Sequence, residues 1–189
     1  MALVTVVTIG AGAPLGQAAE AVARGARVSG NVANVHEVDP DGESLSAALA
    51  DDLRRCLGVA IGSSLPPAET EERLRRLYQL TGAAVDHDRI GIRVATTFTT
   101  LAKDDPSSAE AVDRVNGLLY RWGAVIVSPG NTEPLVDWLD DTPGVEMQPG
   151  EDISLAVGSV AAAERQGRRL GSLVGIIENA LARQARLNL

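Results

Sequence analysis

The residues best suited to chemistry are three glycines near the start of the chain, Gly10, Gly12 and Gly16. They follow an uncharged, β-branched run over residues 3–9. Glycine tolerates positive φ and close approach, so several N–H groups of such a turn can point at one anion. Pro14 suits the first turn of a following helix, whose N-terminus attracts negative charge. The turn has the geometry of a phosphate site. Because no Ser, Thr, Lys or Arg lies within it, a plain strand-to-helix turn is an equally good interpretation.

Two further segments offer hydroxyl groups after apolar runs. Ser63 and Ser64 lie in the predicted loop 62–67, and the sequence TTFTT occupies residues 96–100. Hydroxyls and backbone amides suit a polar ligand chain or the edge of an isoalloxazine ring. Threonine is also favoured in strands, so ordinary strand propensity explains the second segment equally well.

The sequence contains none of the usual catalytic or metal-binding spacings. His36 stands beside Glu37 in a predicted strand, and His87 lies in a polar turn between two aspartates. Neither is part of a metal-ligand motif, and the two serines lack the G-x-S-x-G pattern of a nucleophile elbow. We expect the acidic pairs to be solvated or to cap helices; they are Asp51–Asp52, Asp104–Asp105 and Asp140–Asp141. We therefore assign no catalytic residue and no metal site.

Composition indicates one globular domain over residues 1–189. The chain is 45% hydrophobic and 22% charged, and its net charge of −8 argues against nucleic acid and anionic membranes as partners. Cys56 is the only cysteine, and its place between an amphipathic segment and an apolar run predicts a buried thiol. No secretory signal or apolar run of about 20 residues is present, so we expect a cytoplasmic protein.

Apolar strands and amphipathic helices alternate along the chain. The predicted strands are 3–9, 33–38, 57–61, 90–97 and 124–127. The predicted helices are 17–28, 44–55, 69–80, 107–122 and 153–187. Ser44 is the expected N-cap of the second helix, Ser107 with Glu110 forms a capping box for the fourth, and residues 131–152 are irregular.

This alternation predicts an α/β fold with three layers, in which a parallel sheet is covered by helices on both faces. A flavodoxin-like strand order of 2-1-3-4-5 is favoured over a Rossmann order. The Rossmann fingerprint places its third glycine one position earlier than Gly16, although Asp39 could serve as its acidic residue.

Several segments resemble the flavodoxin-like NAD(P)H:quinone oxidoreductases of the WrbA type. The clearest is 50–100, in which a strand, a loop beginning Gly62-Ser63, a long helix ending at Thr81-Gly82 and a hydroxyl-rich strand end follow each other. The strand AVIVSPG, preceded by YRWG, is similar to another family segment. Near the C-terminus, Gln166, Gly167 and Leu170 stand where the family has its "QGxxVAxL" helix.

The resemblance implies an FMN-dependent enzyme that reduces quinones with NAD(P)H, as a homodimer or homotetramer. Phosphate would lie on the first turn and the remainder of FMN along the other two segments, with Phe98 best placed to stack on the ring. The implied cofactor-binding residues are Gly10, Ala11, Gly12, Leu15, Gly16, Gln17, Ser63, Ser64, Leu65, Thr96, Thr97, Phe98 and Thr99.

The chain also departs from the family at this site. The phosphate loop lacks the family's Ser or Thr, Leu65 replaces an aromatic residue, and the tryptophan that follows the family's D-x-T-G turn is absent. The family's glycine-rich fourth loop is replaced by residues 101–105. The first hypothesis is a flavoenzyme with an atypical site. The alternative is a flavodoxin-like protein without flavin that serves as a cofactor-independent enzyme or a partner-binding subunit. A Rossmann-like nucleotide binder is a third.

Overall fold

A parallel sheet forms the middle layer of the protein. The computed structural model describes residues 1–38, 46–82, 93–101, 106–128, 145–146 and 157–187. The sheet order is β2-β1-β3-β4-β5, the flavodoxin-like order favoured from the sequence, and it excludes the Rossmann order because β3 lies beside β1. Its strands are β1 (Leu3–Ile9), β2 (Val32–Val38), β3 (Gly58–Ser63), β4 (Val94–Thr99) and β5 (Val125–Ile126). A short strand, β6 (Val145–Glu146), also pairs with β4, in a segment predicted to be irregular.

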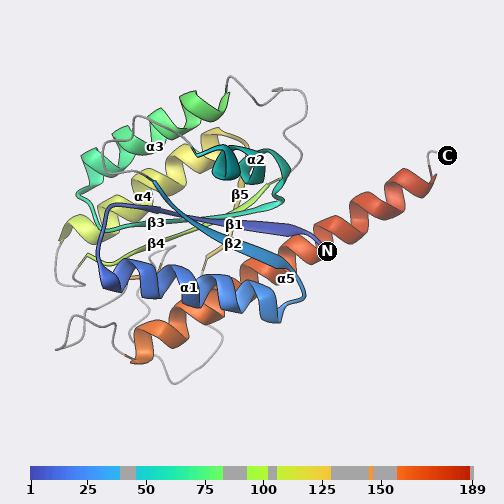
Figure 1. Ribbon diagram of the computed structural model, residues 1–189, viewed down its shortest axis with the longest axis horizontal. Helices are drawn as coiled ribbons and strands as arrows, with labels where there is room; N and C mark the ends of the chain where they lie inside the picture. Colours follow the sequence, from blue (N-terminus) through green and yellow to red (C-terminus); the bar gives the residue numbers. More distant parts are fainter. Residues whose placement is uncertain (39–45, 83–92, 102–105, 129–144, 147–156, 188–189) are drawn as a thin grey trace.

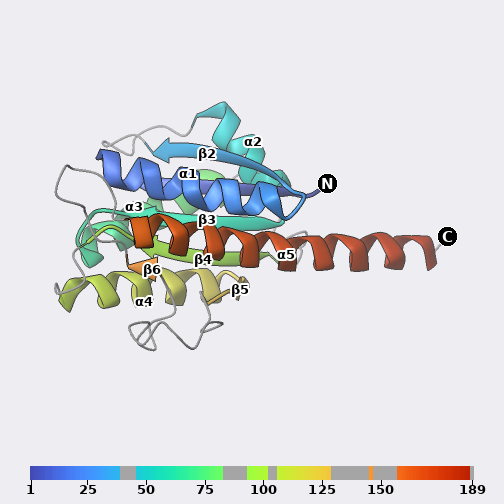
Figure 2. The same cartoon turned by 90° about the horizontal axis from the view of Figure 1, so that it is seen from below.

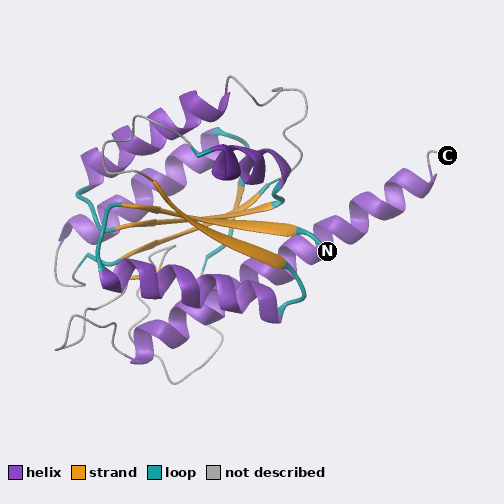
Figure 3. Cartoon of the chain, viewed as in Figure 1, coloured by secondary structure: helices purple, strands orange, loops and turns teal. Residues whose placement is uncertain are grey.

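Helices cover both faces of the sheet (Figures 1 and 3). They are α1 (Ala13–Val28), α2 (Ala47–Arg55), α3 (Pro67–Gly82), α4 (Pro106–Arg121) and α5 (Val157–Leu187). Helices α1 and α5 lie on one face, and α2, α3 and α4 lie on the other. The fold is therefore the three-layer flavodoxin-like arrangement.

The continuous apolar run of β1 reflects burial on both sides. Val4 and Val6 face the core under α1 and α5, whereas Val7 and Ile9 face the core under α2, α3 and α4. A strand with both faces covered needs no alternation of apolar and polar residues.

Helices α1 and α5 approach each other at glycines. A Cβ atom on Gly25 would collide with the Glu164 carbonyl, and one on Gly167 would collide with the Val22 carbonyl. Gly171 is similarly close to Asn31. Gly167 and Gly171 are therefore close-packing points of α5, whereas a Cβ on Gly175 would meet no atom within 4 Å, and the helix continues through all three without a break.

Several element boundaries differ from the sequence-based prediction. The loops expected from Gly62 and from Phe98 begin later, because the β3–β4 ladder continues through the pairs Gly62–Phe98 and Ser63–Thr99. Helix α1 begins at Ala13 rather than at Gln17.

The two predicted helix caps were wrong. Ser46, not Ser44, caps α2, because its hydroxyl accepts the Leu49 N–H at 3.1 Å. Helix α4 begins at Pro106, so Ser107 lies inside the helix and not at its N-cap. Glu110 instead pairs with Arg114. His87, Asp104–Asp105, Asp140–Asp141 and most of 131–152 lie outside the described residues.

Cys56 is buried as predicted, with a side chain that is 3% exposed, and this burial raises the pKa of its thiol. Within the described ranges, no helix is long and apolar enough to cross a membrane.

Candidate functional site

The turns after β1, β3 and β4 meet at the carboxyl edge of the sheet. The order places β2 on one side of β1 and β3 on the other, so the chain changes direction between β1 and β3 at this edge. Ligands of doubly wound sheets bind at such a switch point. The Ser64 N–H donates to the Ile9 carbonyl at 3.3 Å, and the Ser64 hydroxyl donates to the Ala11 carbonyl at 3.2 Å. The turns after β1 and β3 are thus joined directly.

The turn after β1 requires glycine at two positions. Gly10 has a φ of 109° and Gly12 a φ of 124°, values that favour glycine. A side chain on Gly10 would also collide with the Ser64 hydroxyl and press on Leu65. Both glycines therefore shape the turn, and at Gly10 the turn after β3 leaves no room for a side chain.

Among the described residues, no side-chain cap is found at the N-cap position of α1. Gly12 makes no side-chain cap, the first turn carries no acidic residue, and Pro14 has no N–H. The Gly16 N–H bonds back to the Gly12 carbonyl at 3.2 Å, while Ala11, Gly12 and Ala13 are exposed. The first amides of a helix lack intrahelical partners, and together with the helix dipole they favour an anion. This end of α1 presents that environment to the surface.

Other predicted residues of this turn are divided between core and surface. The Leu15 side chain is buried beneath the sheet and anchors α1, whereas Gly16 and Gln17 are exposed. Leu15 contributes to an anion site only through its backbone.

The Ser63 hydroxyl is buried and forms hydrogen bonds within the protein. It lies 2.7 Å from the Thr70 hydroxyl and accepts the Leu65 N–H at 3.1 Å. Thr70 in turn donates to the Leu65 carbonyl at 3.0 Å. Ser63 therefore shapes the turn before α3. Ser64 and Leu65 are half-buried and reach the surface beside it.

The three threonines of β4 are also buried and paired. Thr97 lies 2.9 Å from the amide oxygen of Asn116, and the Thr99 hydroxyl donates to the Ser63 carbonyl at 3.0 Å. The Thr96 hydroxyl donates to the Val127 carbonyl at 2.9 Å and accepts the side-chain amide of Gln166. Their hydroxyls connect strands and helices.

Phe98 lies in the core rather than at the site. Its ring occupies the space where a Cβ of Gly62 would stand, and it is 2% exposed. This placement does not match the expectation of a ring that stacks on a ligand. Because β4 continues to Thr99, the alternation of a strand directs Phe98 beneath α1 and α5.

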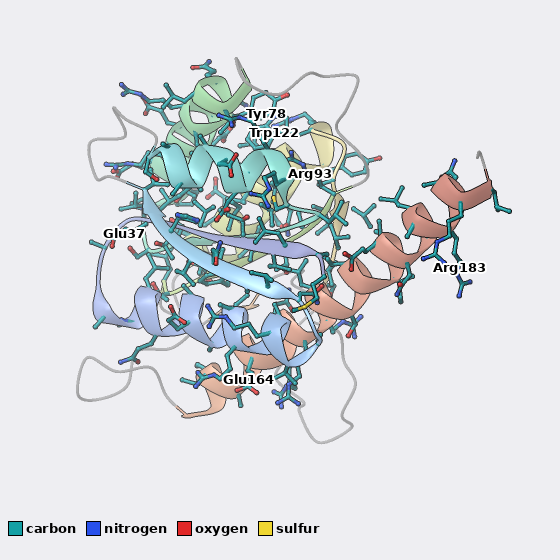
Figure 4. The ribbon with its side chains drawn as sticks, turned by 45° about the vertical axis from the view of Figure 1, so that its right-hand side comes forward. Glu37, Tyr78, Arg93, Trp122, Glu164 and Arg183 are labelled. Carbon is teal, nitrogen blue, oxygen red and sulfur yellow. The ribbon has the colours of Figure 1, made fainter. Side chains whose placement is uncertain are left out.

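The remaining described aromatic side chains lie away from this edge. Tyr78 and Trp122 stack with ring centroids 4.2 Å apart, near the C-terminal ends of α3 and α4 (Figure 4). Those ends lie at the opposite edge of the sheet.

Gln166 is one of the residues that carry the family resemblance near the C-terminus. In the structure it lies where α5 contacts the sheet. Its side chain is fully buried, and its amide donates to the Val127 carbonyl at 3.1 Å. Its amide oxygen finds no hydrogen-bond partner among the described residues. Gln166 thus holds α5 on the sheet through donors alone.

One cluster of three polar side chains was not predicted from the sequence. Asp52 was expected to be solvated or to cap a helix, yet it accepts the Asn34 amide at 2.8 Å and contacts His36 at 2.7 Å. Burial raises the pKa of Asp52, but the hydrogen bonds from Asn34 and His36 outweigh it and leave the pKa below its ordinary value. Asn34 and His36 share a strand face, which is the only sequence signal for this pairing. This cluster lies on α2 and the middle of β2, away from the candidate site.

Across the described ranges, no three His, Cys, Asp or Glu residues gather in a way that could hold a metal ion.

Comparison with known structures agrees with this geometry. A flavodoxin, WrbA-like protein from Agrobacterium tumefaciens superposes with a TM-score of 0.70 at 19% identity, over 92% of this chain and 98% of that one. The chain has the flavodoxin-like fold. A flavodoxin from the domain Archaea gives a TM-score of 0.61 at 14% identity, over 92% and 99% of the two chains. Oxidised Flavodoxin 1 from Bacillus cereus gives 0.58 at 15% identity, over 87% and 94%. No protein-family model and no curated protein sequence matches the chain.

Proposed function

We propose that this protein binds FMN at the turn after β1 and acts as an NAD(P)H-dependent oxidoreductase on quinones. The observation that carries the proposal is the uncapped, exposed N-terminus of α1, which lies at the switch point between β1 and β3. In this strand order the switch point is where FMN binds. The similarity to solved flavodoxins supports the same ligand.

The residues present fit the phosphate group of FMN. The amides of Gly12, Ala13 and Leu15 lie in the exposed turn, and no carboxylate stands in the first turn of α1. An anion there would accept hydrogen bonds from the first N–H groups of α1, which lack intrahelical partners. This phosphate site relies on backbone donors, in contrast to the hydroxyls typical of the resembling family.

The rest of the cofactor would lie along half-buried residues of the neighbouring turns. These are Ser64 and Leu65 after β3, and Thr100 and Leu101 after β4. Leu65 offers an apolar contact, and the backbone of the other residues offers hydrogen bonds. When bound, FMN supplies the hydride and electron transfer, and the chain positions it and excludes water. NAD(P)H as donor, a quinone as acceptor and a cytoplasmic location complete this proposal.

A second candidate is a flavodoxin-like protein that has lost its flavin. The observation in its favour is the internal pairing of Ser63, Thr96, Thr97 and Thr99 and the burial of Phe98. These residues would have to leave their partners to contact a ligand. Such a protein would act without the cofactor or bind a partner through the same edge.

The visible spectrum of the purified protein separates the two candidates. We expect a flavin band near about 450 nm, and quenching of FMN fluorescence when FMN is added to the flavin-free protein. Reduction of the bound flavin by NADH or NADPH, with turnover when a quinone is added, tests the enzymatic part. A colourless protein that binds no FMN at about 100 μM would contradict the first candidate and favour the second.

A further inference from the structure

The Ser64 hydroxyl joins the turn after β3 to the backbone of the turn after β1. It donates to the Ala11 carbonyl at 3.2 Å, although the two residues are 53 positions apart in the sequence. The turn after β1 leads into α1 at the end of the molecule opposite the last turns of α5 (Figure 2). A Cβ atom on Gly10 would collide with the Ser64 oxygen, so the two turns are in direct contact. Ser64 is half-buried and lies beside the candidate phosphate site rather than in the core.

The glycines around Ala11 leave its peptide units without a preferred orientation. Gly10 has a φ of 109°, and Gly12 has a φ of 124° and a ψ of 147°. Without a Cβ atom, glycine adopts such angles about as readily as the mirror-image ones. The sterics of the turn thus permit more than one orientation of the Ala11–Gly12 peptide. The hydrogen bond from Ser64 selects one of them.

This hydrogen bond also determines the direction of one backbone donor. In a trans peptide the carbonyl of one residue and the N–H of the next point in opposite directions, and no cis peptide bond occurs among the described residues. Because the Ala11 carbonyl points to Ser64, the Gly12 N–H points away from the turn after β3. Ala11, Gly12 and Ala13 are exposed, and no described group accepts the Gly12 N–H. This N–H is therefore available to an anion at the start of α1.

The reverse orientation of this peptide would disfavour an anion. If the Ala11–Gly12 peptide turned over, the carbonyl oxygen of Ala11 would stand where the Gly12 N–H now stands. An oxygen with partial negative charge repels a phosphate group, whereas an N–H attracts it. The turn from Gly10 to Gly16 contains no Ser, Thr, Lys or Arg that could compensate. A phosphate site built from backbone groups therefore depends on donors that are oriented before the ligand arrives.

We propose that Ser64 is a positioning residue of the phosphate site and makes the protein select a flavin that carries phosphate. This role rests on the proposed function, because it requires an anion at the start of α1. Ser64 acts through the Ala11 carbonyl and orients the Gly12 N–H, and its hydroxyl does not touch the phosphate. The turn after β1, which has no hydroxyl of its own, thus receives its side-chain support from the turn after β3.

Flavin affinity with and without the phosphate group tests this role. Fluorescence titration of the flavin-free, full-length protein compares FMN with riboflavin for the wild type, Ser64→Ala and Ser29→Ala. The Ser29 hydroxyl donates to the Arg168 carbonyl at 3.0 Å at the other end of α1, so its replacement removes the same kind of hydrogen bond far from the site. Ser64→Ala should raise the dissociation constant of FMN about three- to tenfold, the usual effect of one hydrogen bond, and leave that of riboflavin unchanged. Ser29→Ala should change neither.

The Gly12 amide itself gives a second readout. Its proton and nitrogen chemical shifts are followed by NMR as FMN or inorganic phosphate is added. We expect the Gly12 resonance to shift in the wild type and in Ser29→Ala, and to shift much less in Ser64→Ala. A hydrogen bond that only stabilised the fold would not produce this difference. Circular dichroism verifies that both variants are folded.

The role of Ser64 would be overturned by equal weakening of FMN and riboflavin in Ser64→Ala, or by no weakening of FMN. A Gly12 response that is absent from the wild type, or unchanged in Ser64→Ala, would also overturn it. A wild type that binds no flavin would contradict the proposed function instead. In that case a Gly12 shift with inorganic phosphate that Ser64→Ala loses would still support the positioning role, and the lack of any such shift would overturn it.

Discussion

The imidazole Nε2 of His36 lies 2.7 Å from the Oδ2 atom of Asp52, and this contact joins the edge strand β2 to helix α2. The same oxygen accepts the Asn34 amide. Two residues of one strand face thus contact one carboxylate, and we expect the hydrogen bonds of Asp52 with Asn34 and His36 to stabilise the folded protein.

Replacement of Asp52 tests this group and its pH dependence. Asp52→Ala should lower the free energy of unfolding at pH 7 by about 1–3 kcal/mol, because two donors lose their acceptor. The pKa of Asp52 is lower in the folded protein than its ordinary value of 3.8. Its stabilising effect is therefore complete above about pH 4 and is lost as the pH falls through the lowered pKa.

Urea unfolding at pH 7, 5, 4 and 3 measures this effect. The difference between the wild type and Asp52→Ala should shrink below about pH 4. Asp51→Ala is the matched control, because Asp51 pairs only at the surface with Arg54 and Arg55, and such pairs contribute little. Equal losses for the two variants, with no pH dependence, would contradict the assignment.

The close approach of α1 and α5 is tested at two glycines of one helix. Gly167→Ala should destabilise the protein by about 2–4 kcal/mol, because its Cβ would collide with the Val22 carbonyl and separate the helices. Gly175→Ala meets no atom within 4 Å and should stabilise the helix by about 0.5–1 kcal/mol. Thermal or urea unfolding compares them. Changes of the same sign would be inconsistent with this packing.

Arg27 protects the open edge of β2. The Val32 N–H donates to the Ala2 carbonyl, so the backbone groups of Val32 point toward β1. Backbone groups of successive strand residues point to opposite sides, so the Ala33 carbonyl points to the open edge of the sheet. The Arg27 guanidinium donates to it at 2.7 and 3.1 Å. Unpaired edge groups invite pairing with another chain.

Arg27→Ala should therefore lower the free energy of unfolding by about 1 kcal/mol and increase aggregation on heating. Arg27→Lys keeps the charge but loses the two-pronged donor, and we expect an intermediate result. Urea unfolding and light scattering during a temperature ramp measure both effects. An alanine variant that matches the wild type in both would show that this contact is dispensable.

A charge placed at the N-terminus of α1 tests the proposed phosphate site. Ala13 is exposed in the first helical turn, so Ala13→Glu should not destabilise the helix, whose N-terminus tolerates acidic residues well. It should weaken FMN binding at least tenfold, or about 1.4 kcal/mol, because like charges repel. Gln79→Glu makes the same charge change on α3, near the opposite edge. Fluorescence titration with FMN compares the two, and equal affinities would place the phosphate elsewhere.

The alternation of strands and helices and the first turn could be predicted from the sequence because both are local patterns. Uncharged β-branched runs separated by amphipathic segments lead to a parallel sheet with covered faces. Gly10 and Gly12 mark a turn that no other residue fits, and the structure confirms positive φ at both. The resemblance at Gln166, Gly167 and Leu170 likewise marked the buried face of α5.

Only the tertiary structure decided which side chains are free to contact a ligand. Thr97 and Thr99 look like ligand-facing hydroxyls in the sequence, yet Asn116 and the Ser63 carbonyl are their partners, from segments remote in the sequence. Phe98 enters the core because β4 extends two residues beyond the predicted strand end. Hydrogen bonds between distant segments leave no periodic trace in a sequence. The sequence alone therefore determined the fold and the glycine turn after β1, whereas the packing of the chain determined which polar groups remain free for a ligand.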